Sequence, residues 1–441
     1  MYKVGMASHG CPKNQVDAEI MLQKIKNAGF EITPVEAEAD AIIVNTCGFI
    51  EDAKTEAVEN ILEVAKYKAD GSLKVLIVTG CLAERYRDEI FEEMPEVDAV
   101  VGLAGNNDIV GVLNDALGGI KKGYYGEKEA LIIEGERMLT TPKYTAYVKI
   151  AEGCDNCCTY CAIPSIRGRF RSRTMESIED EVRRVAANGV KEVILVAQDT
   201  TRYGEDLYGS GRLPELLGRL CRINGIKWIR MLYTYPERIT DELIDVMATE
   251  EKVVNYLDIP VQHCNDTVLK RMNRRSTKSA LTELFKKLRD RLPDVTIRTT
   301  LITGFPGETE EQFEELCEFV REIRFDRLGC FAYSEEEGTV AAGFADQIDR
   351  QVRVDRSEMI MNDQLAIILE KNAEKVGTVK EILIEGYDDY IKCYFGRTSS
   401  DAPEIDGKVF FISPKPLVIG TFENVRINDS LEYDLLGELE E

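Results

Sequence analysis

Hydrophobic residues in the first 120 positions form short continuous runs, separated by segments in which apolar residues recur every three or four positions. Continuous apolar runs predict the buried strands of a parallel sheet, and the periodic segments predict helices that cover its two faces. Strands are expected at 3–8, 40–45, 73–79 and 97–101. Helices are expected near 15–27, 51–68, 84–93 and 107–117.

The same alternation resumes after residue 142 and ends with a long charged helix near 349–375. Six β/α units, fewer than the eight of a complete barrel, predict a partial (β/α)6 barrel. Its strands are expected at 146–151, 192–197, 227–232, 254–259, 296–302 and 327–332.

From residue 376 the hydrophobic period changes to two, as in 378–385 and 390–395, and glycines separate the segments. This pattern predicts a small all-β barrel. The fold class is therefore α/β, with an N-terminal parallel-sheet domain, a central partial barrel and a C-terminal β-barrel. The expected boundaries are 1–120, a connector with a hairpin at 121–142, then 143–375 and 376–441.

The net charge of -24 is concentrated at the two ends of the chain. Residues 1–120 hold 21 acidic and 10 basic side chains, and residues 376–441 hold 14 acidic and 6 basic ones. Binding to nucleic acid phosphates needs a basic surface, so this charge disfavours nucleic acid as the primary substrate. A basic protein partner would be attracted instead.

The chain shows no apolar run of membrane-helix length, and its first residues resemble a strand rather than a signal peptide. We therefore expect a soluble cytoplasmic protein with no membrane partner. In that compartment its twelve cysteines stay reduced, which excludes a disulfide framework. Only two histidines, His9 and His263, are available for metal binding or acid–base catalysis.

Three cysteines with C-x3-C-x2-C spacing carry the clearest chemical signal: Cys154, Cys158 and Cys161, called here the cluster-loop cysteines. Their spacing offers three thiolates to a four-iron cubane and leaves one iron open to a small molecule. They follow the first predicted barrel strand, where barrel enzymes place their chemistry. The neighbouring Cys157 also permits a four-thiolate zinc knot. A knot would be closed and more often links two hairpins, so the pattern favours a cluster with Cys157 unligated.

A second set, called here the sheet-edge cysteines, follows three different strands of the N-terminal sheet: Cys11, Cys47 and Cys81. The carboxyl ends of parallel strands meet at one edge, so topology brings these distant residues together. The alternative is three buried structural cysteines. Each cysteine stands beside a glycine just past a strand, which favours a second iron–sulfur cluster, again with one open iron.

These motifs resemble those of known families. The C-x3-C-x2-C loop on a β/α barrel resembles the radical S-adenosylmethionine enzymes, and the whole domain order resembles the methylthiotransferases. Within that group, four segments are similar to the RimO-type enzymes: Gly10-Cys-Pro-Lys-Asn, Asn45-Thr-Cys-Gly-Phe-Ile, Ala162-Ile-Pro-Ser-Ile-Arg-Gly-Arg-Phe-Arg-Ser-Arg173 and Gly396-Arg-Thr-Ser-Ser-Asp-Ala-Pro-Glu-Ile-Asp-Gly407. Cys157, where arginine is typical, and Ser399-Ser400 depart from the family pattern.

The resemblance implies a transferase that adds a methylthio group to the β-carbon of an aspartate in the twelfth protein of the small ribosomal subunit. It implies two [4Fe-4S] clusters, one on each cysteine set. S-adenosylmethionine would serve both as the radical source and as the methyl donor, and the sheet-edge cluster would hold the transferred sulfur. The radical arises at the cluster-loop cysteines, so no other side chain is assigned a catalytic role. Partners would be a basic ribosomal protein, free or in the assembled subunit, and an electron donor.

Three alternatives remain at this point. The related MiaB-type enzymes act on tRNA adenosine, and the C-terminal barrel resembles a TRAM domain, which often binds RNA. Its acidic charge favours the basic ribosomal protein. A non-enzymatic iron–sulfur carrier and a zinc-bound RNA-binding module are the more distant alternatives.

The loops after the predicted barrel strands should contact the cofactor and substrate. The expected S-adenosylmethionine contacts are Gln198, Asp199 and Thr200 after the second strand, Tyr160, Arg167 and Gly304. The segments 233–236, 260–263 and 303–308 should converge on the same face. His263 is interpreted as a packed, hydrogen-bonded residue, and His9 either tunes the sheet-edge cluster or is a plain loop residue.

Overall fold

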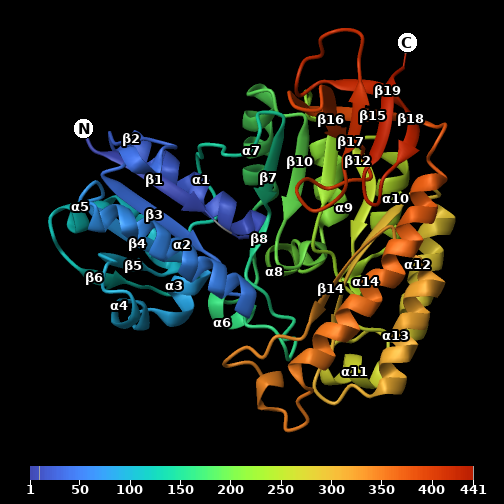
Figure 1. The fold of residues 1–441 in the computed structure, drawn as a ribbon, viewed down its shortest axis with the longest axis horizontal. Coiled ribbons are helices and arrows are strands. Elements are labelled where there is room, and N and C mark those ends of the chain that lie inside the picture. Colours follow the sequence, from blue (N-terminus) through green and yellow to red (C-terminus); the bar gives the residue numbers. More distant parts are fainter. Residues whose placement is uncertain (9, 441) are drawn as a thin grey trace.

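The computed structural model describes residues 1–8 and 10–440, which form three successive parts (Figure 1). The first is a parallel sheet with strand order β2-β1-β3-β4-β5-β6. Its strands are β1 (Lys3–Ser8), β2 (Glu31–Ile32), β3 (Ala41–Thr46), β4 (Val75–Gly80), β5 (Ala99–Val101) and β6 (Lys122–Tyr124). Both faces of β3 and β4 are buried, as their continuous apolar sequences predicted.

Two separate apolar cores lie on the two faces of this sheet. One is built with α2, α3 and α4, and the other with α1 and α5. These helices are α1 (Pro12–Asn27), α2 (Glu51–Ala69), α3 (Cys81–Tyr86), α4 (Glu89–Glu93) and α5 (Ile109–Leu117). Short 3-10 turns occur at η1 (Glu36–Glu38), η2 (Leu103–Asp108) and η3 (Lys128–Ala130).

The central part is an open, six-stranded parallel sheet with strand order β14-β13-β12-β11-β10-β7. Its strands are β7 (Thr145–Lys149), β10 (Glu192–Val196), β11 (Trp228–Met231), β12 (Val253–Asp258), β13 (Thr296–Thr303) and β14 (Arg327–Ala332). The main helices around it are α7 (Met175–Ala187), α9 (Leu213–Cys221), α10 (Asp241–Thr249), α12 (Lys278–Arg291), α13 (Glu310–Ile323) and α14 (Arg350–Ala373). The prediction of a partial (β/α)6 barrel is thus confirmed.

Shorter elements decorate the ends of the barrel strands. They are β8 (Ala151–Glu152), α6 (Ile163–Arg167), β9 (Arg171–Ser172), η4 (Thr200–Arg202), α8 (Glu205–Tyr208), η5 (Pro236–Arg238), α11 (Asp266–Arg271) and η6 (Ala341–Gly343). Threonine side chains cap four of the barrel helices by accepting a hydrogen bond from a first-turn amide. These caps fix where each helix begins, and therefore where each preceding loop ends.

The C-terminal part is a closed barrel of strand order β15-β16-β17-β19-β18. Its strands are β15 (Val379–Asp388), β16 (Cys393–Arg397), β17 (Val409–Ile412), β18 (Phe422–Ser430) and β19 (Leu435–Leu439). Alternate residues of these strands fill its small apolar core. The predicted all-β barrel is confirmed.

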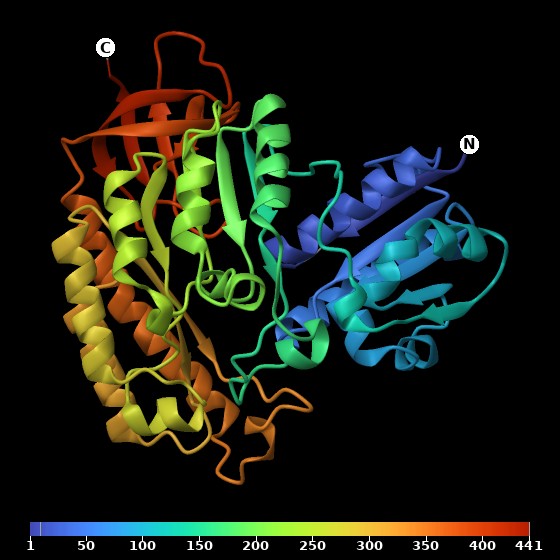
Figure 2. The same ribbon diagram turned by 180° about the vertical axis from the view of Figure 1, so that it is seen from behind.

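The C-terminal barrel packs on the N-terminal ends of the central strands. Phe422 of β18 lies edge-on to Trp228 at the start of β11, with ring centroids 4.8 Å apart. Glu192 at the start of β10 accepts a hydrogen bond of 2.6 Å from Arg397. Both views show this barrel (red) at the opposite end of the central strands from α6 (Figures 1 and 2). The C-terminal ends of the strands are thereby left for the functional loops.

The N-terminal part lies beside the central barrel, away from α12 and α13 (Figure 2). Val16 and Ile20 of α1 join the apolar cluster on the inner face of the barrel strands, together with Tyr147 and Ile194. Helix α1 therefore couples the first sheet directly to the barrel interior.

Two local expectations were wrong, and one strand was missed. Residues 122–124, expected in a connector with a hairpin, form β6 and pair in parallel with β5. The helix expected over 84–93 is split into α3 and α4, because Arg87 adopts a left-handed conformation with φ of 46°. The pair β1 and β2 adds an edge that the sequence pattern did not reveal. None of the helices in the described residues combines the length and apolar character that crossing a membrane requires.

Candidate functional site

The cluster-loop cysteines lie in the loop between β8 and α6, beyond the C-terminal end of β7. Gly153 begins this loop with φ of 79°, and a Cβ there would collide with the carbonyl of Arg169. The amide of Thr159 donates to the carbonyl of Met272 over 3.1 Å. The carbonyl of Cys157 accepts from Asn273 Nδ2 over 2.8 Å. These two hydrogen bonds hold the loop against the segment that follows α11, while the Cys157 residue is exposed.

The cluster-loop sulfurs influence one another electrostatically. Burial raises the pKa of Cys154 to about 11, and the nearby Cys158 adds to the increase. Burial also raises the pKa of Cys161, with Cys158 and Cys154 among the further causes. The thiols of Cys154 and Cys161 therefore resist ionisation until a cation compensates the charge, and iron–sulfur ligation supplies that compensation. This donor set fits a cluster.

The sheet-edge cysteines come from the carboxyl ends of three adjacent strands. Cys11 is the N-cap residue of α1 after β1, Cys47 follows β3, and Cys81 begins α3 directly after β4. A Cβ on Gly10 would lie 3.2 Å from the Cβ of Cys47, so the first two loops touch. The predicted convergence of these loops at one edge is observed.

The ionisation of the sheet-edge thiols is unequal. Burial raises the pKa of Cys81 to about 12, with contributions from Cys11 and Cys47. Burial and Cys11 likewise raise the pKa of Cys47. Burial would raise the pKa of Cys11 too, but the cations Lys13 and Arg167 outweigh it and the pKa is lowered. Cys11 is therefore the readiest of the three to bind metal as a thiolate.

Within residues 1–8 and 10–440, no three His, Cys, Asp or Glu side chains are grouped so as to hold a single metal ion. A cubane presents a different iron to each cysteine, so its sulfurs stand further apart than the ligands of one ion. Cluster binding by either cysteine set stays a prediction.

A buried ion cluster joins the two cysteine sets across the interface of the N-terminal part and the barrel. It consists of Asp17, Lys149, Glu152 and Arg167, and is called here the interdomain ion cluster. Arg167 lies at the end of α6, and its guanidinium is 3.1 Å from Asp17, 2.9 Å from Glu152 and 3.4 Å from the sulfur of Cys81. It also donates to Asn14 of α1. The helix that follows the cluster-loop cysteines thus extends a side chain to the sheet-edge set.

The loop after β11 also reaches both sets. The Tyr235 hydroxyl lies 3.0 Å from the sulfur of Cys158. Two residues earlier in the chain is Tyr233. The Lys13 ammonium lies over the Tyr233 ring, 3.2 Å from the ring centroid. Cys11 and Cys47 are among the groups that add to the burial-driven increase in the pKa of Tyr233. One loop at the C-terminal end of the barrel therefore lies close to both cysteine sets.

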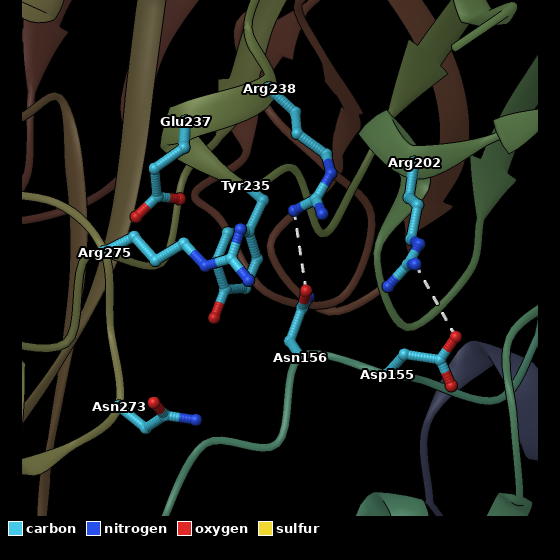
Figure 3. Close-up of a pocket in the computed structure, with 8 residues that line it drawn as sticks. All are labelled: Asp155, Asn156, Arg202, Tyr235, Glu237, Arg238, Asn273 and Arg275. Atoms are coloured by element: carbon cyan, nitrogen blue, oxygen red, sulfur yellow. Dashed lines mark hydrogen bonds and ion pairs between the residues drawn. The ribbon is translucent and has the colours of Figure 1, made fainter. Parts of the chain in front are cut away.

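Two cavities open beside the cluster loop. One of about 390 Å³ is shown in Figure 3, where Arg202 pairs with Asp155 and Arg238 bonds to Asn156. Its wall also includes the ring of Tyr235. The other, of about 880 Å³, lies between the N-terminal part and the loop. It is lined by Arg87, Tyr125, Gly126, Glu127, Lys128, Glu129, Cys154, Asp155, Cys157, Pro164, Gly168 and Arg169.

The segment after β10 turns inward at the barrel mouth. Gln198 donates to Glu152 over 2.8 Å, while its own Oε1 is buried without a hydrogen-bond partner among the described residues. Asp199 is fully buried and accepts from Asn156 and Thr201. The Thr200 hydroxyl donates to the carbonyl of Leu232. An orphaned carboxamide oxygen beside the cluster loop suits an ammonium donor, such as that of S-adenosylmethionine.

The other expected cofactor contacts are more dispersed. Tyr160 packs against the apolar group around Phe305, one residue after Gly304. Gly304 has φ of 68°, and its missing Cβ leaves room for Arg353 of α14. This glycine therefore allows the turn after β13 to pack closely against α14. Arg167 belongs to the interdomain ion cluster. Their contact with a cofactor stays a prediction.

Of the two histidines, His263 is buried and its Nδ1 accepts a hydrogen bond from the amide of Asn265 over 2.9 Å. His9 lies outside the described residues. Sequence reasoning missed the roles of Lys13, Asn14 and Asp17. The expected helix began at residue 15, whereas α1 begins at Pro12, so Lys13 and Asn14 were not placed on its first turn.

Comparisons with known proteins agree along the entire chain. Residues 3–102 match the model of the uncharacterized protein family UPF0004, residues 148–320 match the radical SAM superfamily, and residues 376–439 match the TRAM domain. The ribosomal protein uS12 methylthiotransferase RimO of Desulforamulus reducens is 52% identical over 100% of both chains. The enzyme of the same name from Acetivibrio thermocellus is 51% identical, over 99% of this chain and 98% of the relative.

Among solved structures, the radical S-adenosylmethionine methyltransferase TsrM from Kitasatospora setae, with cobalamin and a [4Fe-4S] cluster bound, has a similar fold. The TM-score is 0.57, with 14% identity over 75% of each chain. At this identity the likeness concerns the fold alone.

Proposed function

The chain belongs to the family of ribosomal protein uS12 methylthiotransferases of the RimO type, and we propose that it transfers a methylthio group to the β-carbon of an aspartate of uS12. The observation that supports the proposal is that Arg167 and the loop of Tyr233 and Tyr235 connect the surroundings of the two three-cysteine sets. A reaction that joins a radical step to a sulfur transfer needs both centres near one substrate.

The residues that would hold the cofactors follow from the donor sets. The cluster-loop cysteines would hold one [4Fe-4S] cluster and the sheet-edge cysteines the other. Gln198 Oε1, buried and unpartnered among the described residues, supports S-adenosylmethionine binding at the barrel mouth. When bound, these groups supply the radical chemistry that breaks an unactivated C–H bond, together with the sulfur and methyl that are added.

The side chains of the protein orient and enclose the reacting groups. Tyr235 can donate its hydroxyl to the Cys158 thiolate, which stabilises the negative charge on that sulfur. Arg167 does the same for Cys81, while Asp17 and Glu152 fix its guanidinium. Because these charges are buried and mutually paired, the interface stays closed to water without leaving an uncompensated ion.

The partners follow from the same reasoning. The substrate uS12 would be a basic ribosomal protein, attracted by the acidic N- and C-terminal parts, either free or in the assembled small subunit. An electron donor outside this chain would supply the reducing equivalents. A ribosomal substrate would be consistent with a reaction in the cytoplasm. The domains would be an N-terminal methylthiotransferase domain at 1–120, a connector at 121–142 whose strand β6 is added to the N-terminal sheet, the radical-SAM barrel at 143–375 and the TRAM-like barrel at 376–441.

The decisive experiment is anaerobic reconstitution of the protein with iron and sulfide, followed by incubation with uS12, S-adenosylmethionine and a reductant. Mass spectrometry of uS12 should then find a methylthio group on one aspartate. A parallel reaction with tRNA should leave its adenosines unmodified. Modification of tRNA with unmodified uS12 would assign the chain to the tRNA-directed alternative, and cofactor-independent sulfur release would favour a carrier.

A further inference from the structure

Lys13 stands out among the buried cations of the described residues. Its side chain is on the second residue of α1, two positions after Cys11, and only 7% of the residue is exposed. Within residues 1–8 and 10–440 its ammonium makes no hydrogen bond or ion pair, and its contact is the face of the Tyr233 ring, 3.2 Å from the centroid. A lysine is seldom buried without a paired anion, so this position is prepared for an anion from outside the chain.

The carboxylates that come nearest to Lys13 are already engaged. Asp258 accepts from the amide of Tyr233 over 3.0 Å and pairs with Arg298. Glu152 accepts from Lys149, Arg167 and Gln198. The positive end of the α1 macrodipole adds to the field of the ammonium. An incoming carboxylate would therefore meet a desolvated ammonium whose neighbouring carboxylates are engaged elsewhere, and whose other anionic neighbour is the thiolate of Cys11.

Lys13 is close in sequence to one cysteine set and contacts the loop that reaches the other. Its ring partner Tyr233 is two residues from Tyr235, whose hydroxyl contacts Cys158. Two residues of chain span at most about 7 Å, so the two tyrosines start from neighbouring backbone positions. Cys11 lies on the other side, two residues before Lys13. An anion held at Lys13 would thus lie near Cys11 and beside the loop that contacts Cys158.

We propose that Lys13, seated on Tyr233, is the binding site for the side-chain carboxylate of the target aspartate. The inference rests on the proposed function, because it takes the substrate to be an aspartate. The β-carbon is bonded directly to that carboxylate carbon, so an ion pair at Lys13 fixes the reacting carbon near Cys11 and beside the loop that contacts Cys158. An adenosine base offers no carboxylate, and Lys13 therefore also contributes to selecting protein over tRNA.

The test is a double-mutant cycle, in which affinities are compared for substitutions at Lys13 and at the target residue. The reconstituted enzyme is titrated anaerobically with uS12 and with uS12 whose target aspartate is changed to asparagine, which has the same shape without the charge. Wild-type enzyme should bind the aspartate form at least about tenfold more tightly, the factor expected of a charge-assisted hydrogen bond. Lys13→Met should reduce that preference to about twofold or less, while Lys13→Arg should keep most of it.

Lys26→Met is the matched control, because Lys26 lies exposed on the same helix and should leave the preference unchanged. Iron content and S-adenosylmethionine cleavage are measured for every variant. If Lys13 only compensates the charge at Cys11, Lys13→Met will weaken both uS12 forms equally or lower the iron content, and the proposal is overturned.

The wild-type arm decides the matter even where a variant fails to assemble. Equal affinity of wild-type enzyme for the aspartate and asparagine forms refutes the carboxylate site. Failure of the proposed function is a separate result, since an enzyme that never methylthiolates uS12 fails in the product assay. Methylthiolation of uS12 together with an undiminished preference in Lys13→Met would refute the role of Lys13 alone.

Discussion

Glu192 is the buried charge on which the docking of the C-terminal barrel depends. Its two carboxylate oxygens accept from Arg230 of β11 over 2.9 Å and from Arg397 of β16 over 2.6 Å. All three side chains are at most 1% exposed. The guanidinium of Arg230 also donates to the carbonyl of Ser399, so the network spans both domains.

The perturbation is Glu192→Gln, which keeps the size of the side chain and removes its charge. The amide nitrogen of glutamine is a donor and would face a guanidinium that is also a donor, so the buried Arg230 would lose its paired anion, while Arg397 would keep its ion pair with Glu385. Breaking a buried ion pair in this way costs about 3 to 5 kcal/mol of unfolding free energy. For a domain of this size we expect the melting temperature to fall by about 6 to 20 °C.

The matched control is Glu381→Gln. Glu381 pairs with Lys227 across the same domain boundary, but both side chains are 43% exposed. Removing this exposed pair should change stability by less than about 1 kcal/mol. Urea unfolding followed by circular dichroism, with hydrogen exchange in strands β15–β19, measures both variants.

The effect of Glu192 should also depend on pH. Burial alone would raise the pKa of Glu192, but Arg397 and Arg230 outweigh burial and hold the pKa below 4.5. Its contribution is therefore fully present above pH 4.5 and is lost as the pH falls through the lowered pKa. The difference between wild type and Glu192→Gln should shrink in that acidic range. Equal destabilisation by the two variants at neutral pH would refute this reasoning.

Three further predictions concern the functional end of the barrel. Replacing the cluster-loop cysteines by alanine should abolish formation of 5′-deoxyadenosine and methionine, whereas replacing the sheet-edge cysteines should spare cofactor cleavage and stop only thiolation. Chromatography of the products checks this, and deoxyadenosine from the first variant would contradict the assignment. Tyr235→Phe removes the hydroxyl beside Cys158 and should lower the reduction potential of that cluster, because hydrogen bonds to sulfur favour the reduced state. An unchanged potential in a redox titration would exclude this role. Gly304→Ala forces a Cβ against Arg353 at φ of 68° and should cost about 1 to 3 kcal/mol, whereas Gly218→Ala in α9, with open space around it, should gain up to about 1 kcal/mol. Thermal unfolding separates the two, and similar shifts would contradict the strain argument.

The large elements were predictable because their signals are local. The strand β3 is a fully buried run, and its apolar sequence alone predicts a central parallel strand. The strands β2 and β6, of two and three residues, escaped because their existence depends on pairing with distant neighbours rather than on their own sequence. The break at Arg87 depends on backbone geometry that no hydrophobic pattern encodes.

One part of the candidate site was likewise predictable from the sequence, and another part was not. The convergence of Cys11, Cys47 and Cys81 followed from topology, since loops after parallel strands share one edge. The electrostatic setting of these cysteines did not, because it comes from contacts such as that of Arg167 with Asn14, 153 positions apart. The segment around Asp401 resembled a family motif in sequence, yet only packing reveals that Asp401 pairs with Arg327 of β14, across the boundary between the C-terminal and central parts.

The central claim is that two separate cysteine sets each hold an iron–sulfur cluster, and iron content tests it most directly. Anaerobically reconstituted wild-type protein should contain about eight irons per chain, and each variant lacking one cysteine set should contain about four. A wild-type content near four irons, or the same content in both variants and the wild type, would contradict the claim.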